Sequence, residues 1–264
     1  MSANAEARQN ALDRVLDASN PTAALGEELF AVADALSGSP SLRRALTDAG
    51  TAEEARVNVV GALFAGRVSE QAMRVLTGAV KLSWSTTGSF VAAVERQGVR
   101  ALLGQAQLEG RLDEVENQLF RVGRIVDSHP DLRVALGERR VDLGARQALL
   151  GDVFGDKVLP ATQTLARRAV LARQRTFAST LEGYLKTAAE LRNRGIATVE
   201  TAQPLTDDQA SRLRAALSRQ LGREVTLNMI VNPAVLGGVR VSVGDEVIEG
   251  TVAGRLSDVR RNLS

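Results

Sequence analysis

The sequence predicts a mainly α-helical protein, in which two tandem homologous helical bundles precede a small α/β domain. From about residue 10 to 195, apolar residues recur at three- and four-residue spacing, the period of an amphipathic helix. After Gly195 the pattern changes to the alternation typical of strands. The helical part also repeats itself at an offset of 90 residues. We therefore expect domains over 1–94, 95–195 and 196–264.

Two apolar stripes illustrate the helical period in the two halves of this region. They comprise Leu25, Leu29, Val32 and Leu36, and then Val115, Leu119, Val122 and Val126. Proline and glycine residues interrupt such stripes, which predicts helices of roughly 8 to 20 residues joined by short loops. This pattern is typical of packed helical bundles.

The internal repeat supports a duplication. Residues 39–68 align with 129–158 without a gap, and 10–80 share 17 identities in 71 positions with 100–170. That is more than this composition, rich in alanine, leucine and arginine, gives by chance. A period of 90 residues is too long for a solenoid repeat and suits a whole bundle that was copied once.

Two of the repeated identities are polar and are our candidates for contact with a partner. They place Arg43 opposite Arg133, and Arg56 opposite Arg146. The alternative is structural: an arginine stem covers apolar surface while its guanidinium meets water or a helix C-terminus.

The C-terminal part predicts a compact α/β module. We expect strands over 196–202 and 224–231 on either side of a helix over 205–222, in which Thr206 is the N-cap. The long helix of "TFASTLEGYLKTAAELRNRG" precedes this module.

The glycine-rich stretch "VNPAVLGGVRVSVGDEVIEGTV" lacks the spacing of a dinucleotide fingerprint or a P-loop. Its Gly-Asp pair instead fits a two-residue hairpin turn. That turn pairs Val241 with Ile248 and places Arg240 opposite Glu249 as an opposite-charge pair. The structural turn residues that we predict here are Asn232, Gly237, Gly238, Gly244, Asp245 and Gly250.

A final helix is expected after Gly250. Its apolar stripe, at spacings of four, three and four residues, consists of Val252, Leu256, Val259 and Leu263. The stripe is either part of the core or a docking surface for a partner helix.

Composition excludes or disfavours several kinds of chemistry. The chain has no cysteine and one histidine, His129, so thiolate nucleophiles, disulfides and histidine-pair zinc sites are excluded. Acidic groups fall at predicted helix starts, where capping accounts for them. Arginines are interleaved with acids and aromatic residues make up 3%, which disfavours nucleic-acid binding. No signal peptide or membrane span is expected, so we expect a soluble, cytosolic chain without direct membrane insertion and without cofactor or metal.

The run "VTLNMIVNPAVLGGVRVSVGDEVIEGTVAGRLSDVRRNL" resembles the C-terminal signature of the F-type ATP synthase delta subunit, the family of the oligomycin-sensitivity-conferring protein. Asn232, Glu249 and Thr251 stand where Asp, Asp and Ser are more usual. The resemblance covers about residues 95–264. Residues 1–94 then form a second copy of the bundle, an arrangement similar to that of actinobacterial delta subunits.

This resemblance implies a non-catalytic stator subunit, peripheral at the cytoplasmic face of the bacterial plasma membrane. The family's bundle binds N-terminal helices of the alpha subunits, and its C-terminal domain meets the b subunit of the peripheral stalk. A groove for an amphipathic helix is the recognition mode that this implies. The extra bundle would contact the stalk or a second head subunit. The alternative classes are a generic helical adaptor outside ATP synthase and, with no polar constellation to support it, an enzyme.

Overall fold

The computed structural model describes residues 3–172, 176–192, 195–221, 225–233, 235, 238–243 and 246–249. Contacts divide the chain into two units. One unit, which we call the helical unit, spans Pro21–Arg192. The other, the sheet unit, joins the N-terminal helix α1 (Ala3–Ala18) to the strands near the C-terminus.

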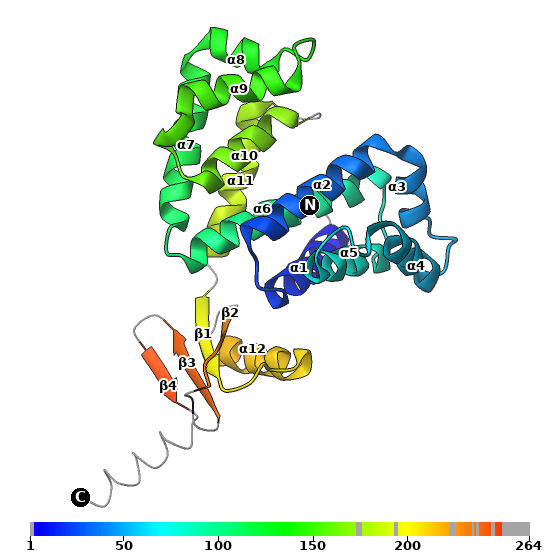
Figure 1. Cartoon of the computed structure of the whole chain (residues 1–264), viewed down its shortest axis with the longest axis vertical. Coiled ribbons are helices and arrows are strands. Elements are labelled where there is room, and N and C mark those ends of the chain that lie inside the picture. The colour runs from blue at the N-terminus through cyan, green and yellow to red at the C-terminus, as the bar shows by residue number, and fades with distance from the viewer. Residues whose placement is uncertain are drawn as a thin grey trace, which may run out of the picture. The chain divides into compact units, whose positions relative to one another are not determined.

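The helical unit consists of consecutive helices joined by short loops (Figure 1). In chain order they are α2 (Ala23–Gly38), α3 (Pro40–Thr47), α4 (Glu53–Phe64), α5 (Glu70–Lys81), α6 (Thr87–Leu108), α7 (Leu112–Ser128), α8 (Pro130–Gly137), α9 (Leu143–Phe154), the 3-10 helix η1 (Gly155–Lys157), α10 (Pro160–Leu171) and α11 (Phe177–Arg192).

Side-chain caps and prolines set many of these helix starts. The Ser39 hydroxyl accepts a hydrogen bond from the backbone N–H of Leu42, and Pro40 occupies the first turn of α3, where its missing N–H costs nothing. Thr86 and Ser89 form a capping box at the start of α6.

Helix bounds in the helical unit follow the 90-residue offset of the sequence repeat. α3, α4 and α5 begin and end 90 residues before α8, α9 and α10, respectively. The same offset aligns α11 with residues 87–102 and α1 with residues 93–108. Both of these ranges lie in α6, which is therefore the last helix of the first copy and also the first helix of the second copy.

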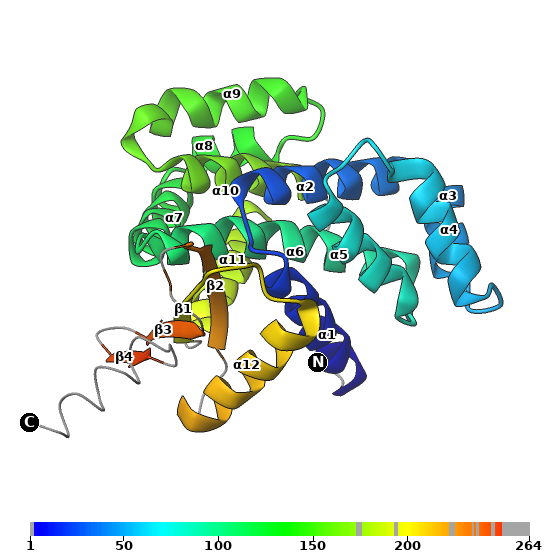
Figure 2. The same cartoon turned by 60° about the horizontal axis from the view of Figure 1, so that its bottom comes forward.

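We call α2 to α5 with the start of α6 the first copy, and the end of α6 with α7 to α11 the second copy. Figures 1 and 2 both show α6 running from one copy into the other. A helix that serves two cores must be apolar on more than one face, and between Gln97 and Leu103 every residue of α6 is buried.

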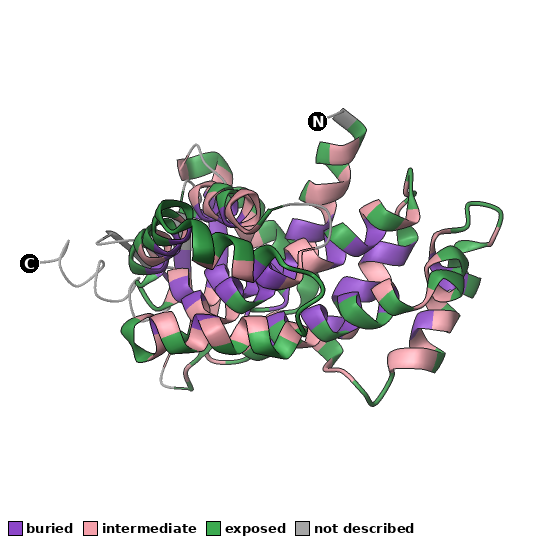
Figure 3. Cartoon of the chain, turned by 90° about the horizontal axis from the view of Figure 1, so that it is seen from above, coloured by how far each residue is buried: buried purple, intermediate pink, exposed green. Residues whose placement is uncertain are grey.

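The core of the second copy gathers buried side chains from α6, α7, α8, α9, α10 and α11. Figure 3 shows buried residues where helices face one another and exposed residues on their outer sides. Phe30, from α2 of the first copy, belongs to the same cluster, so the two copies share apolar contacts as well as a helix.

The sheet unit has strands β1 (Gly195–Thr201), β2 (Val225–Val231), β3 (Val239–Val243) and β4 (Glu246–Glu249), with helix α12 (Asp207–Leu221) between β1 and β2. The strand order is β2-β1-β3-β4. β1 and β2 are parallel, as the intervening helix requires, and the other two pairs are antiparallel. Its core holds Ala197, Val199, Leu217, Val225, Leu227 and Val241.

The predicted fold class, mainly α with a small C-terminal α/β domain, is confirmed. The sequence-based domain limits follow the repeat and stay a prediction. Contacts group the chain differently: the limit between residues 94 and 95 falls inside α6, and α1 contacts α12 and β2. Within the described ranges, every helix is too short or too polar to span a bilayer.

Candidate functional site

Arg43 of α3 and Arg133 of α8 each bind backbone oxygens near the end of the preceding helix. The Arg43 guanidinium donates from Nη1 to the backbone oxygens of Leu36, at 2.8 Å, and Ser37, at 2.6 Å, where α2 ends. Nη1 of Arg133 donates to the backbone oxygen of Asp127, at 3.4 Å, near the end of α7. Each arginine thus satisfies carbonyls that a helix C-terminus leaves open, where a positive charge is favourable.

Arg56 and Arg146 also bind backbone oxygens. Nη1 of Arg56, a buried residue, donates to Asp48 at 2.8 Å and to Thr51 at 3.3 Å. Nη1 of Arg146 donates to Leu136 at 3.3 Å and to Val170 at 3.5 Å. These contacts give all four repeated arginines a structural role, and contact with a partner stays a prediction for them.

The described part of the C-terminal signature is structural. β3 and β4 pair in the predicted register, Val241 with Ile248 and Arg240 opposite Glu249. Asn232 directly follows β2, and its N–H donates to the Thr201 carbonyl at 2.8 Å. Gly238 has a φ of 112°, which favours glycine. The other predicted residues lie outside the described residues: Gly237, Gly244, Asp245, Gly250, Val252, Leu256, Val259 and Leu263.

A close helix crossing in the first copy was not predicted from the sequence. α2 packs against α6 through Gly26 and Gly98, and the Phe30 ring lies over Gly98. A Cβ atom added at Gly98 would come within 2.7 Å of two Phe30 ring carbons and 3.0 Å of the Gly26 carbonyl oxygen. Only glycine at position 98 therefore leaves room for the ring.

Arg168 joins the two copies at the same place. From α10, its Nη1 donates to Asp34 of α2 at 2.7 Å and its Nε to Glu95 of α6 at 2.8 Å. Its guanidinium lies 4.8 Å from the centroid of the Phe30 ring. Burial opposes the charge of Arg168, but the bonds to Asp34 and Glu95 outweigh it and raise the pKa.

Tyr184 of α11 lies close to this cluster. Its hydroxyl is buried without a hydrogen-bond partner among the described residues. Burial, together with the negative charge of Glu95, raises the pKa of Tyr184 well above its usual range, so the phenol stays neutral.

The second copy differs at the equivalent crossing of α7 and α11. The offset places Glu116, Ala188 and Arg192 where the first copy has Gly26, Gly98 and Leu102. Arg192 forms an ion pair with Glu116 at 3.0 Å. Phe120, the counterpart of Phe30, is 57% exposed, whereas Phe30 is 6% exposed.

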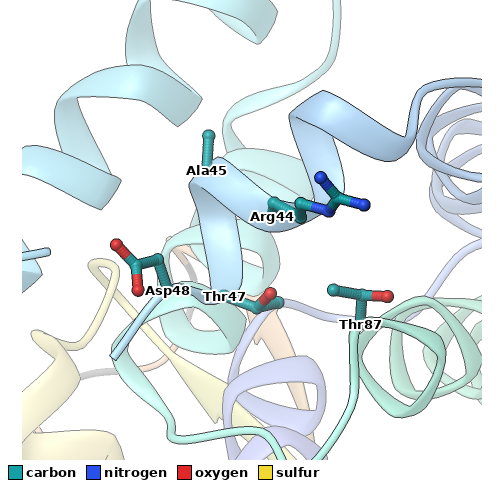
Figure 4. A pocket seen from close by; sticks show the side chains of 5 residues that line it. All are labelled: Arg44, Ala45, Thr47, Asp48 and Thr87. Atoms are coloured by element: carbon teal, nitrogen blue, oxygen red, sulfur yellow. The ribbon is translucent and has the colours of Figure 1, made fainter. Parts of the chain in front are cut away.

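A hollow of about 370 Å³ in the first copy is lined by Arg44, Ala45, Thr47, Asp48 and Thr87 (Figure 4). Asp48 accepts from the Thr51 hydroxyl at 2.8 Å and from the N–H of Gly50 at 3.1 Å, bonds that lower its pKa and close the turn between α3 and α4. The carboxylate is thus occupied by the fold. No histidine, cysteine or lysine lines the hollow.

The described residues contain no group of three or more histidine, cysteine, aspartate and glutamate side chains that could hold a metal ion. His129 is exposed near the end of α7, where its Nδ1 lies 2.8 Å from the Ile125 carbonyl oxygen. The exposed side chains of the helices are the remaining features of the described residues.

Comparison with known proteins identifies the family. The family model of the ATP synthase delta (OSCP) subunit matches residues 94–263. The ATP synthase subunit delta of Streptomyces avermitilis is 44% identical over 99% of this chain and 96% of its own. The subunit delta of Cutibacterium acnes is 40% identical over 96% of this chain and 96% of its own. That of Streptomyces coelicolor is 42% identical over 98% of this chain and 95% of its own.

A chain of the Toxoplasma gondii mitochondrial ATP synthase hexamer superposes over 62% of this chain and 94% of its own, with 21% identity. The TM-score of 0.27 is too low for conclusions about the arrangement of the helices. The subunit delta relatives also cover residues that precede the family model, so they include the first copy. From these matches, the chain belongs to the ATP synthase delta (OSCP) subunit family.

Proposed function

We propose that this chain is a non-catalytic stator subunit of an F-type ATP synthase that links the catalytic head to the peripheral stalk. The observation that carries the proposal is the match to subunit delta proteins over almost the whole chain. Its partners would be N-terminal helices of the alpha subunits and the b subunit. It would act at the cytoplasmic face of the bacterial plasma membrane, coupling proton flow to ATP synthesis.

The contacts of the helical unit support such a mechanical role. A stator link must transmit torque without deforming, which favours large apolar contacts between its parts. The two copies share α6, the buried Phe30 and the Arg168 ion pairs, so they do not depend on a flexible linker.

Stripping this chain from membranes that contain its ATP synthase tests the proposal. ATP hydrolysis should continue while ATP-driven proton pumping is lost, and adding the purified chain should restore pumping. A chain that neither binds the stripped enzyme nor restores pumping would contradict the proposal. Co-purification with unrelated proteins instead of head and stalk subunits would favour a generic adaptor.

The role of the first copy needs a separate test, because deletion of 1–94 would cut α6 and remove Phe30. Since the chain has no cysteine, single-cysteine variants carry one label each. Arg67→Cys and its repeat counterpart Lys157→Cys, at the end of η1, report on exposed positions of the first and second copies. We expect both to cross-link to head or stalk subunits. Cross-links from Lys157→Cys alone would show that the first copy has no such contact.

A further inference from the structure

Phe120 and Phe30 occupy the same position of the repeat, so the surroundings of one can be compared with those of the other. In the first copy, this position of the repeat lies over Gly98, where an added Cβ would meet the ring, and it joins the core cluster of the second copy. In the second copy the equivalent of Gly98 is Ala188, which carries a Cβ. Phe120 is absent from that core cluster and lies on the surface of α7, 57% exposed.

The charge beside the ring is reversed between the copies. Asp34 lies four residues after Phe30, on the same helix face, and binds the guanidinium of Arg168. Arg124 lies four residues after Phe120, and Arg121 directly follows the ring. Both arginines are exposed, and within the described ranges neither is within hydrogen-bond or ion-pair distance of a partner. The face of α2 with Asp34 binds a cation, so the equivalent face of α7 with its two arginines suits binding to a carboxylate.

We propose that Phe120, Arg121 and Arg124 on α7 form a docking surface for an acidic amphipathic helix of another ATP synthase subunit. The inference rests on the proposed function and specifies the chemistry of one partner. Aromatic and arginine side chains are the residue types that most often dominate the binding energy of interfaces. A second copy of this chain cannot receive Phe120 at its Gly98 position, because its own Phe30 fills that position.

The test uses the full-length chain and its ATP synthase stripped of this subunit. Phe120→Asp and Arg124→Glu should each weaken rebinding by about 10-fold or more, the loss expected for a hot-spot side chain. Both positions are exposed, so the free energy of unfolding should stay unchanged. Val134→Asp is the matched control, since Val134 is an apolar residue 66% exposed on α8, and it should rebind like the wild type.

Thiol protection gives an independent readout. Asn117→Cys, one turn before Phe120, should react with a maleimide in the free chain and be protected in the assembled enzyme, whereas Val134→Cys should react in both. The affinity of the wild type should fall with added salt more steeply than that of Arg124→Ala.

The outcomes separate this inference from the proposed function. Failure of the wild-type chain to rebind would overturn both. Wild-type rebinding together with equal rebinding of Phe120→Asp, or with a reactive Asn117→Cys in the complex, would overturn the docking surface alone. Self-association of the free chain that Phe120→Asp abolishes would also overturn it, since the occupant would then be a second copy.

Discussion

α2 and α7 occupy equivalent positions in the two copies, yet their surroundings differ. α2 buries two stripes of side chains. The first stripe, whose counterpart is also buried in the second copy, consists of Leu25, Leu29, Val32 and Leu36. The second stripe consists of Gly26, Phe30 and Ala33. α7 buries only the first, as Val115, Leu119, Val122 and Val126, after Leu112. The second stripe of α7 holds Glu116, Phe120 and Gly123, none of which is buried.

The difference shows how a duplicated bundle can divide its tasks. In the first copy, glycines at the crossing let two backbones approach and a phenylalanine enter the core. In the second copy, an alanine and an ion pair occupy the same positions, and the equivalent phenylalanine is exposed. The same position of the repeat is thus an internal contact in one copy and exposed surface in the other.

The largest effect in this comparison should come from the two phenylalanines. Phe30→Ala leaves a cavity in a packed core and should lower the free energy of unfolding by about 3–5 kcal/mol. Phe120→Ala, at an exposed position, should change it by no more than about 0.5 kcal/mol. Urea unfolding followed by circular dichroism measures both. Equal losses for the two variants would mean that the copies do not differ as described.

The next effect concerns the glycine crossing. Gly98→Val would push a side chain into the Phe30 ring and the Gly26 carbonyl, and overpacking of this kind costs about 1–3 kcal/mol. Gly61→Ala in α4 is the control, because a Cβ there meets nothing within 4 Å and alanine favours a helix by up to about 1 kcal/mol. Thermal unfolding should shift in opposite directions for the two variants. A neutral Gly98→Val would contradict the close approach.

A smaller effect is expected from the ion pairs between the copies. Arg168→Ala leaves Asp34 and Glu95 without their cation, but both carboxylates are partly exposed, so the loss should be about 1–2 kcal/mol. A lysine ammonium has three donors but lacks the planar, fixed donor geometry with which a guanidinium binds both carboxylates and lies over Phe30, so Arg168→Lys should recover only part of the loss. Arg124→Ala, the control on α7, should be neutral. The same urea titrations measure the free energy of unfolding of these variants. An Arg168→Ala variant as stable as the wild type would show that Arg168 does not stabilise the contact between the copies.

The smallest effect is a pH dependence in the turn of the first copy. Bonds from Thr51 and Gly50 lower the pKa of Asp48 in the folded state, so this stabilisation exists above the unfolded pKa and disappears as the pH falls through the folded one. Asp48→Asn should therefore be less stable than the wild type at neutral pH and equal to it well below pH 3.8. A difference that persists in acid would assign the effect to the amide substitution itself.

Local patterns were sufficient for several features. The register of β3 and β4 follows from a two-residue turn and alternation, and both are readable within a dozen residues. Thr206 caps its helix as predicted, since a cap involves residues only three positions apart. The repeat likewise predicted which helices correspond.

Other features depend on residues far apart in the chain. The four repeated arginines were partner candidates, but the sequence left open that they bind carbonyls, because the ends of helices come within reach only after packing. No sequence pattern predicts the contacts of Arg168. Its partners Asp34 and Glu95 lie 134 and 73 residues away, and no local spacing relates them.

The amino-acid sequence alone determined the helical period, the duplication, the hairpin and, through its C-terminal signature, the family. These properties depend on the order of neighbouring residues, because the periods of helices and strands place such residues on defined faces. Only the tertiary structure decided that α6 serves both copies and that Phe30 is buried while Phe120 is exposed. The two phenylalanines are identical in type and position within the repeat. Phe30 packs over Gly98 and against residues of the second copy, including Arg168, whereas Phe120 has Ala188 at the position of Gly98 and is absent from the core cluster. These neighbours come together only when the helices pack.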